Sequence, residues 1–369
     1  MKKNILYINH ISELGGGEYG LLNLIKAMDK DKYNLTLLLQ NEGPLSNAVQ
    51  KIGVRVRFIK MRGWRKIKNV PQNYLFTLPK IRKMVKELKI DLIHCNTYRL
   101  NPYSVLVAKS IGIPCITHIR WFTRKDHIKK FKLDKADLLI AMSDYMASFF
   151  KNSSCNVRTI YDGIDIDKFK RTEKIRRKIR KELNIDSDKF LVGMIAQITP
   201  RKGHKDFIKA AALVRDTLPK IRFVVVGGSI IDSTLSLQEL KDYAEEVGAS
   251  NLIFLGQRDD VPDIFSALDC FVLPSHTEPF GLVVIEAMAA KVPVVATCSG
   301  GPEEIIIPGE SGILIPIKDP NAIANAVTKM FYDKDFRNHS IENAYIRVRD
   351  KFDISKYAEI MDETYRKMF

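Results

Sequence analysis

The chain has 369 residues, of which 46% are hydrophobic and 28% charged, enough to fill the cores of two ordinary domains. No apolar run reaches the length of about 18 residues that a transmembrane helix needs, so we predict no transmembrane helix. The N-terminus leads into a strand without a signal-peptide cleavage pattern, so we predict no signal peptide. Five scattered cysteines without metal-ligand spacing favour a reducing, cytoplasmic location, and Cys95, Cys115 and Cys270 are predicted to be buried thiols.

The net charge of +16 is concentrated in the first half of the chain. Residues 1–170 contain 31 lysines and arginines against 14 acidic residues, whereas residues 171–369 contain 28 against 29. Because a generally lysine-rich composition would affect both halves, the asymmetry favours an anionic partner: a membrane surface, a phosphorylated acceptor or a nucleic acid. The basic half is not accompanied by a nucleic-acid recognition motif, so we expect no nucleic acid as partner.

A glycine-rich loop follows the first predicted strand. The strand Ile5–Asn9 and the helix Glu18–Met28 are joined by a loop that ends in Gly15, Gly16 and Gly17. Glycines at this place let the backbone approach a phosphate closely, so the three glycines are candidate donor-binding residues.

The same loop supports an alternative. Gly15, Gly17 and Gly20 fit the G-x-G-x-x-G fingerprint of dinucleotide-binding domains, and Glu42 after the second strand, Leu35–Leu39, would bind the ribose. On these residues a nicotinamide-dependent oxidoreductase is possible.

Strands and helices continue to alternate up to residue 150, which predicts a parallel, doubly wound sheet. The expected strands are Val54–Ile59, Asp91–Cys95, Pro114–His118 and Asp137–Ala141, and the expected helices are Tyr74–Leu88, Asn101–Ile111 and Asp144–Phe150. Two basic stretches interrupt this pattern, Lys60–Lys68 and Arg120–Lys125. Each contains one tryptophan, Trp64 or Trp121, among cations, a mixture typical of interfacial membrane anchors; packed loops are the alternative.

His118 ends the predicted strand Ile116–Ile119. In open α/β sheets ligands bind at the carboxyl ends of strands, so His118 is a candidate functional residue, with a structural histidine as the alternative.

The alternation repeats in the second half and predicts a second domain of the same class. A basic helix, Thr172–Leu183, is expected at the domain junction, and a last helix at Ile354–Met368. The expected strands are Phe190–Ala196, Ile221–Val226, Leu252–Leu255, Phe271–Pro274, Val292–Ala296 and Gly312–Ile315, and the helices lie near 204–215, 236–247, 261–267, 281–290 and 303–307.

Two carboxylates, Glu278 and Glu286, lie eight residues apart around the start of one of these helices. The backbone N–H groups of Phe280, Gly281 and Leu282 would be unpaired donors of a helix start, where the helix dipole favours a phosphate. Glu278 could accept hydrogen bonds from sugar hydroxyls and Glu286 from ribose hydroxyls. The alternative is an ordinary strand–helix–strand unit in which the two glutamates have no binding role.

The segment Glu278–Ala296 matches E-P-F-G-L-x-x-x-E-A-M-A-x-x-x-P-V-V-A almost position by position, and a G-G-x-x-E sequence follows at Gly300–Glu304. It resembles the Glu-x7-Glu motif of retaining GT-B glycosyltransferases of family 4, the group 1 glycosyl transferases. The resemblance extends over the chain but is sharp only from residue 197 onward.

This resemblance implies an α/β protein of the GT-B fold, with two Rossmann-like doubly wound parallel-sheet domains facing a central cleft. Residues 1–170 would form the acceptor-side domain, residues 171–350 the nucleotide-sugar-binding domain, and residues 351–369 a helix packing back towards the N-terminal domain. The family's N-G-V/I-D-x-x-x-F turn is matched at Tyr161–Phe169, with Asp162 in place of the usual Asn.

The resemblance also implies site residues. The family sequence G-R-x-x-x-x-K-G is represented by Gln197–Gly203, so Lys202 corresponds to the phosphate lysine, while Gln197 replaces the arginine and Arg201 can supply that charge. The expected catalytic residues are His118, which would reach the donor sugar, Glu278 and Lys202. The expected donor-binding residues are Gly15, Gly16, Gly17, Arg201, Lys202, Gly228, Arg258, Phe280, Gly281, Leu282 and Glu286.

The implied reaction is transfer of a sugar, with retention, from a nucleotide-diphosphate sugar (UDP or GDP) to a glycan or lipid-linked acceptor in cell-surface polysaccharide or glycoconjugate synthesis. No cofactor and no metal are expected, because a helix N-terminus with Lys202 and Arg201 can neutralise the diphosphate and no suitably placed Asp-x-Asp occurs. The charge asymmetry further predicts that the protein is peripheral at the inner face of an anionic membrane. A sugar-nucleotide epimerase of the same fold is a further alternative to the oxidoreductase.

Overall fold

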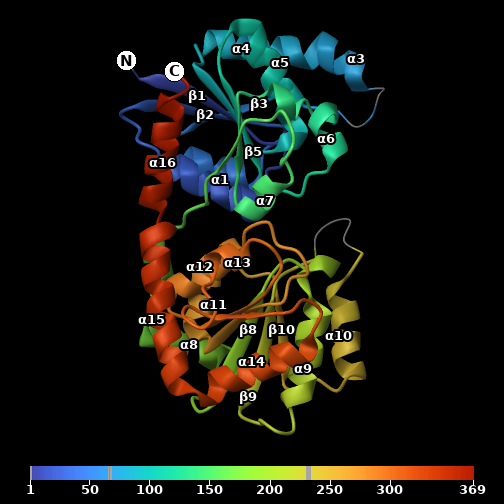
Figure 1. The fold of residues 1–369 in the computed structure, drawn as a ribbon, viewed down its shortest axis with the longest axis vertical. Coiled ribbons are helices and arrows are strands. Elements are labelled where there is room, and N and C mark those ends of the chain that lie inside the picture. The colour runs from blue at the N-terminus through green and yellow to red at the C-terminus, as the bar shows by residue number, and fades with distance from the viewer. Residues whose placement is uncertain (1, 65, 67–68, 230–233) are drawn as a thin grey trace. The chain divides into compact units, whose positions relative to one another are not determined.

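The computed structural model describes residues 2–64, 66, 69–229 and 234–369, and the chain forms two compact units (Figure 1). Unit 1 comprises Met1–Ile164 together with Ile354–Phe369, and unit 2 comprises Asp165–Asp353. The sequence-based boundaries, after residues 170 and 350, lie a few residues from these divisions.

Unit 1 contains a seven-stranded parallel sheet in the order β3-β2-β1-β4-β5-β6-β7. Its strands are β1 Lys3–Ile8, β2 Tyr33–Leu39, β3 Arg55–Phe58, β4 Leu92–Cys95, β5 Cys115–Ile119, β6 Leu138–Ala141 and β7 Val157–Thr159. Its helices are α1 Gly16–Ala27, α2 Pro44–Lys51, α3 Val70–Gln72, α4 Leu78–Glu87, α5 Asn101–Ile111, α6 Lys125–Lys130, α7 Asp144–Ser148 and α16 Ile354–Arg366, with a π-helix, η2, at Asn73–Thr77.

Unit 2 contains a six-stranded parallel sheet in the order β10-β9-β8-β11-β12-β13. Its strands are β8 Phe190–Ile195, β9 Ile221–Val226, β10 Leu252–Gly256, β11 Cys270–Leu273, β12 Val294–Thr297 and β13 Ile313–Ile315. Its helices are α8 Glu173–Glu182, α9 His204–Val214, α10 Leu237–Glu246, α11 Val261–Ala267, α12 Leu282–Ala289, α13 Pro302–Ile305, α14 Pro320–Tyr332 and α15 Lys334–Lys351. The two sheets confirm the predicted Rossmann-like class.

Alternate residues of the central strands face opposite sides of the unit 1 sheet, and each side is covered by helices. Ile5 and Tyr7 of β1 pack with residues of α1, α2 and α16, whereas Leu6 and Ile8 pack with residues of α4 and α5. Burial on both faces explains why the strands are short continuous apolar runs and not alternating ones.

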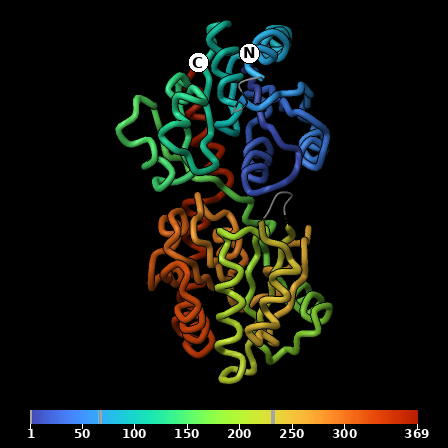
Figure 2. Tube along the Cα trace, turned by 90° about the vertical axis from the view of Figure 1, so that its right-hand side faces the viewer, coloured from blue at the N-terminus to red at the C-terminus, as the bar shows by residue number. Residues whose placement is uncertain are grey.

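The C-terminal helix α16 belongs to unit 1 because three of its side chains enter that core. Tyr357, Met361 and Tyr365 are buried with residues of α1 and the sheet. Figures 1 and 2 show this last segment returning to the unit that contains the N-terminus.

The structure adds elements that the sequence pattern did not indicate. The helices α2, α6, α14 and α15 and the edge strand β7 were not predicted, and the expected helix Tyr74–Leu88 is broken into η2 and α4. The three cysteines predicted to be buried are buried. Within the described residues, no helix combines the length and apolar character needed to cross a bilayer.

Candidate active site

The strand order of unit 2 reverses between β8 and β11, which creates a crevice outside the carboxyl ends of these two strands. The loop after β8 contains Arg201 and Lys202, and the loop after β11 contains Ser275 and Glu278. The two sequence motifs that resemble the family's donor site therefore meet at the topological switch point, although 76 residues separate Lys202 from Glu278.

Lys202 and Glu278 form an ion pair at the centre of this crevice. Lys202 Nζ donates to Glu278 Oε2 over 2.5 Å, and the Ser275 hydroxyl donates to the same oxygen over 3.1 Å. The side chains are 12% and 10% exposed, so a bound ligand could reach the edge of the pair. Burial lowers the pKa of Lys202, and the neighbouring Glu278 carboxylate opposes this shift.

Arg201 adds a second cation. Its Nη1 lies 4.0 Å from Glu278 Oε2 and donates to the carbonyl oxygen of Thr277 over 3.3 Å. Burial lowers the pKa of the guanidinium, which nevertheless stays charged at neutral pH. The structure thus places Arg201 beside the Lys202–Glu278 pair, while Gln197 is exposed after β8.

Backbone contacts between neighbouring loops hold Glu278 in place. Its N–H donates to the carbonyl of Ser299 over 2.8 Å, and its own carbonyl accepts from Gly301 N–H over 2.9 Å. A Cβ at Gly301 would lie 2.3 Å from the backbone of Phe280, so only glycine allows the loops after β11 and β12 to meet this closely. The G-G-x-x-E sequence therefore supports Glu278.

Helix α12 begins where the sequence predicted. Gly281 precedes it with a φ of +109°, a left-handed conformation that favours glycine, and Leu282 is its first residue. In the first turn the Val284 N–H donates to the carbonyl of the capping residue Gly281 over 2.8 Å. The N–H groups before it precede any carbonyl of their own helix, so this N-terminus can accept an anion. The Phe280 ring packs on Phe352 and is 1% exposed, so the phenylalanine side chain is a core residue.

Two further glycines are required by close approaches around the crevice. A Cβ at Gly203, with φ +73°, would lie 1.9 Å from the carbonyl oxygen of Pro274, and a Cβ at Gly227 would lie 1.8 Å from that of Ala196. The predicted donor residue Gly228 follows Gly227 at the end of β9 and faces Gln257. These contacts draw the carboxyl ends of β8, β9 and β11 together.

Glu286 lies one turn inside α12, and its side chain is partly buried. Burial raises the pKa of this carboxyl to about 7, and the nearby Lys168 opposes the shift. The carboxyl is therefore poised between its neutral and charged forms near physiological pH.

Arg258 is engaged with protein carboxylates. It donates to both carboxylate oxygens of Asp260 over 2.8 and 2.7 Å and to Glu182 over 2.5 Å. These partners raise the pKa of the guanidinium. Arg258, which was predicted to flank a nucleobase, thus joins the loop after β10 to α8. Because its N–H groups bind these carboxylates, a nucleobase would contact it through the planar face of the guanidinium.

In unit 1 the glycine loop lies at the start of α1. Gly15 caps the helix and accepts hydrogen bonds from Glu18 and Tyr19, while Gly16 and Gly17 form its first turn and not the preceding loop. A Cβ at Gly20 would lie 2.6 Å from Arg120 and 2.8 Å from Asp162. Gly20, the third glycine of the dinucleotide fingerprint, thus has a structural role: a larger residue would collide with the buried Arg120–Asp162 ion pair.

The structure places His118 differently from the expectation. Its side chain is 0% exposed, it stacks on His94, and Arg120 lies 3.4 Å from its Nδ1. Among the described residues its Nε2 has no hydrogen-bond partner, and burial lowers its pKa well below the usual value. His118 is a neutral interior histidine in this structure, and direct contact with a donor sugar would require it to become exposed.

Arg120, which the sequence placed in a basic surface stretch, is instead the centre of a buried network. Its Nη1 lies 2.5 Å from Asp162 Oδ2, with the two side chains 6% and 0% exposed, and its Nε donates to Asn96 over 2.6 Å. Asn96 donates to Asn9, and Asn9 donates to Glu18 in the first turn of α1. In the sequence, this ion pair is indicated by Asp162, an acidic residue at the position where the family's turn usually has Asn.

Of the two tryptophans predicted as membrane anchors, Trp64 differs from that expectation. The Trp64 ring packs against Tyr74 and Tyr103 and is partly buried against the core, so it is not a free anchor. Trp121 is 42% exposed and contacts Phe122. Residues 65, 67 and 68 of the first basic stretch lie outside the described residues.

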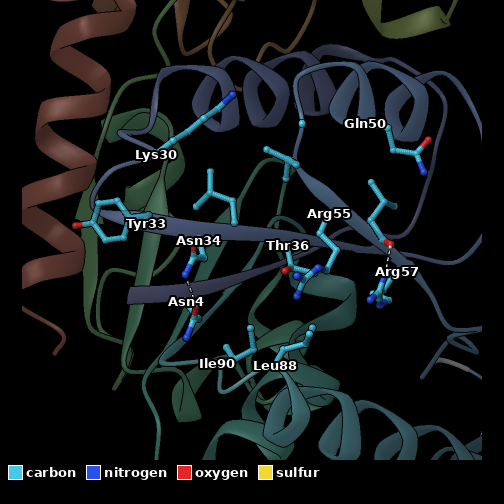
Figure 3. A pocket seen from close by; sticks show the side chains of 14 residues that line it. Asn4, Lys30, Tyr33, Asn34, Thr36, Gln50, Arg55, Arg57, Leu88 and Ile90 are labelled. Atoms are coloured by element: carbon cyan, nitrogen blue, oxygen red, sulfur yellow. Dashed lines mark hydrogen bonds between the residues drawn. The ribbon is translucent and has the colours of Figure 1, made fainter. Parts of the chain in front are cut away.

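A hollow of about 730 Å³ lies elsewhere in unit 1, beside β1, β2 and β3 (Figure 3). It includes Asn4 and Asn34 near the amino ends of their strands, away from the carboxyl ends where the glycine loop begins. Two of its cations already donate to backbone carbonyls, Lys30 to Ile52 and Arg57 to Val56. It is separate from the candidate site.

Comparisons with known proteins match both halves of the chain to glycosyltransferases. Residues 175–347 match the family model for glycosyl transferases group 1, and residues 14–168 match the model for glycosyltransferase family 4. Together the two models extend over most of both units. The chain belongs to the group 1 glycosyltransferases of the GT-B fold.

Individual relatives share limited sequence identity. D-inositol 3-phosphate glycosyltransferase of Corynebacterium jeikeium is 31% identical over 64% of this chain and 58% of its own length. The corresponding protein of Corynebacterium urealyticum is 32% identical over 56% of this chain and 51% of its own. The chain thus spans little more than half of these relatives. UDP-Gal:alpha-D-GlcNAc-diphosphoundecaprenol alpha-1,3-galactosyltransferase of Escherichia coli is 23% identical over 100% of this chain and 97% of its own.

Solved structures confirm the fold. Anabaena HepE in complex with UDP and glucose matches with a TM-score of 0.87 and 23% identity, over 98% of this chain and 99% of its own. Sucrose-phosphate synthase from Thermosynechococcus elongatus matches with a TM-score of 0.81 and 21% identity, over 100% of this chain and 99% of its own.

Proposed function

We propose that this protein transfers a sugar from a nucleotide-diphosphate sugar, with retention of the anomeric configuration, to a glycan or lipid-linked acceptor in cell-surface polysaccharide or glycoconjugate synthesis. The observation that supports this most directly is the Lys202–Glu278 pair, with Arg201 beside it, at the switch point of unit 2. Two cations and a helix N-terminus surround the place where a diphosphate would leave.

The chemistry assigned to these residues is stabilisation of the leaving group. When the bond between the anomeric carbon and the diphosphate oxygen breaks, both electrons go to that oxygen, and Lys202 and Arg201 would offset the negative charge. The acceptor hydroxyl oxygen bonds to the anomeric carbon from the same face, and its proton passes to the departing phosphate. Glu278 would orient the sugar through its hydroxyls, and Glu286 would bind the ribose.

UDP is the donor nucleotide we favour, with GDP as the alternative. The solved relative HepE was crystallised with UDP and glucose, and the Escherichia coli relative is a UDP-galactose enzyme with a diphosphoundecaprenol-linked acceptor. Among the described residues no group of three histidine, cysteine or acidic side chains is placed to hold a metal ion, and we propose that the two cations neutralise the diphosphate instead.

The test is a thermal-shift screen against UDP, GDP and ADP sugars, since a ligand that binds the folded state raises the melting temperature. It is followed by product analysis with and without acceptor, in buffer and in EDTA. New glycosidic product that requires the acceptor, keeps the donor's anomeric configuration and forms equally in EDTA would support the proposal. An epimerised donor formed without acceptor would favour the epimerase, and a shift with NADH but with no nucleotide sugar would favour the oxidoreductase.

A further inference from the structure

A short surface segment of unit 1 has its polar side chains inside and its apolar side chains outside. In the π-helix η2, Asn73 and Thr77 are 0% and 3% exposed, whereas Tyr74, Leu75 and Phe76 are 47%, 67% and 58% exposed. A helix on the surface of a protein in water normally shows the opposite arrangement. Three consecutive large apolar residues directed to solvent indicate a surface made for an apolar environment.

Polar contacts hold this segment in its inverted orientation. The Asn73 side chain donates to the carbonyl of Arg62 over 3.4 Å, and the Tyr103 hydroxyl donates to the same carbonyl over 2.8 Å. Tyr103 also interacts with the Thr77 side chain. Both inner side chains thus make hydrogen bonds, although Asn73 Oδ1 has no partner among the described residues. Rotating the segment to bury its apolar side chains would break these bonds. π-Helical turns of this kind are frequently found at functional sites.

The segment lies at the carboxyl end of the unit 1 sheet. Arg62 follows β3, and Tyr103 lies in the first turn of α5, which follows β4. Helix α4 starts directly after the segment and leads back to the amino end, where β4 begins (Figure 1). The exposed apolar side chains are thus at the same end of the sheet as Gly15–Gly17, which open α1.

The adjoining helix exposes a row of cations. Lys80, Arg82, Lys83 and Lys86 of α4 are exposed, and residues 69–90 contain five lysines and arginines but a single acid, Glu87. Glu87 lies 3.8 Å from Lys83, with both side chains more than half exposed, so it offsets little of this charge. Apolar side chains beside cations match the acyl boundary and the phosphates of an anionic bilayer.

We propose that Tyr74, Leu75 and Phe76 insert into the interface of an anionic membrane while Lys80, Lys83 and Lys86 bind lipid phosphates. This inference rests on the proposed function insofar as a lipid-linked acceptor is presented at the membrane. In this orientation α4 lies along the bilayer surface, because its three lysines are spread over most of the helix. A second copy of the chain is a poorer occupant, because a two-fold contact through this surface would oppose the same cations.

The test is flotation of the full-length protein with vesicles of phosphatidylcholine alone and of equal parts phosphatidylcholine and phosphatidylglycerol, at low and high salt. Wild type should bind the anionic vesicles at low salt and dissociate at high salt. The variant Tyr74→Ser/Leu75→Ser/Phe76→Ser should bind at least about tenfold more weakly. A matched control replaces three scattered exposed apolar residues of unit 2, Leu213→Ser/Tyr332→Ser/Ile346→Ser, and should bind as wild type.

Charge is tested separately with Lys80→Gln/Lys83→Gln/Lys86→Gln against Lys174→Gln/Lys241→Gln/Lys334→Gln, three exposed lysines of unit 2. The first should lose binding to anionic vesicles by about tenfold and the second should not. Leu75→Trp provides a readout that does not depend on a triple variant folding, since its tryptophan emission should shift to the blue with anionic vesicles.

Several outcomes would overturn the proposal: wild type that does not float with anionic vesicles, an apolar triple variant that binds as well as wild type, or an unshifted Leu75→Trp. A dimer in sedimentation velocity that the apolar triple variant abolishes would identify the surface as an interface between copies. Transfer to a water-soluble acceptor should be equal in wild type and the apolar triple variant. If neither wild type nor the apolar triple variant transferred sugar, the proposed function would be contradicted, and the vesicle experiments would then test membrane binding independently of it.

Discussion

At the scale of single residues, the proposed donor site consists of a cation and a carboxylate from two loops. Lys202 and Glu278 contact each other over 2.5 Å, and Glu278 has two further polar neighbours, Arg201 and Ser275. Because both are mostly buried and paired, removing one leaves the other's charge without its partner. Their variants are therefore expected to lower stability as well as activity, so folding has to be verified for each variant.

Lys202→Ala and Glu278→Gln should each lower kcat by about 100-fold or more, because Lys202 would stabilise the charge that develops on the leaving diphosphate and Glu278 would hold the sugar in its reactive orientation. Steady-state kinetics with a nucleotide sugar and acceptor would measure this, with circular dichroism to verify folding. Lys209→Ala and Glu310→Gln, two exposed positions of the same unit, are the matched controls and should keep wild-type turnover. Near-normal kcat in either site variant would exclude the assigned role.

Glu286 gives a prediction about pH. Its folded-state pKa is raised to about 7, above the ordinary value of 4.5, so the folded state retains a proton that the unfolded state has lost between these values. The stability from this group is fully present at low pH and is lost as pH rises through about 7. Relative to Glu286→Gln, the unfolding free energy of wild type should fall by about 1–3 kcal/mol between about pH 5 and about pH 8. Urea titrations of both proteins across pH would measure it, and parallel curves would contradict the shift.

At the scale of elements, glycines decide how closely the loops at the carboxyl ends of the strands can approach. Gly203 joins η6, Pro200–Lys202, to α9 and lies against the backbone of Pro274 after β11. The contact places the loop of Lys202 beside the loop of Glu278.

Gly203→Ala should therefore destabilise the protein by roughly 2–4 kcal/mol, because a Cβ at φ +73° is strained and would lie 1.9 Å from the Pro274 carbonyl. Gly309→Ala is the matched control: it has φ +80° but open space around it, so only about 1 kcal/mol is expected. Equilibrium denaturation would compare the two. Equal losses would show that the close approach to Pro274 is unimportant.

A second element-scale feature is the Arg120–Asp162 pair, which joins the end of β5 to the segment just before the unit boundary. Arg120→Met or Asp162→Ala should each cost about 3–5 kcal/mol of unfolding free energy, because one buried charge is left unpaired. The double variant should lose less than the sum of the two. As a control, Asp216→Ala removes the exposed partner of the Arg215–Asp216 pair and should leave stability unchanged. Additive losses would argue against direct coupling of Arg120 with Asp162.

At the scale of the whole molecule, the chain crosses between its units twice, at 164/165 and at 353/354. The N–H of Ile354 donates to the carbonyl of Ile164 over 2.9 Å, so the two crossings lie side by side. The charge is divided along the same line: the excess of cations belongs to residues 1–170 and the remainder is close to neutral.

This division predicts a salt effect that depends on the acceptor. Transfer to an acceptor embedded in anionic vesicles should fall about tenfold from low to high salt, because salt screens attraction between the basic unit and the lipid. Transfer to the same acceptor headgroup in solution should change little. Transfer rates measured on both acceptors over a salt series would test this explanation. Equal salt dependence for the two acceptors would indicate that salt acts within the proposed donor site and not on attraction to the lipid.

The sequence by itself determined the fold class and the strand–helix segment that contains Glu278, because both depend on local patterns. Continuous apolar runs alternating with helical segments specify parallel sheets, and the spacing from Glu278 to Ala296 places a carboxylate, a glycine and a helix start within one short segment. Strands such as Ile221–Val226 and helices such as Asn101–Ile111 were therefore predicted with their observed bounds.

Contacts between distant residues were decided only by the tertiary structure. The sequence alone does not show that Arg120 is buried against Asp162, that His118 is enclosed beside His94, or that Glu182 and Asp260 engage Arg258. Nor does its hydrophobic pattern reveal that Asn73 faces inward and Leu75 outward, because that orientation depends on hydrogen bonds to Arg62. Burial, and with it the pKa and the accessibility of a charged group, depends on which elements pack against it.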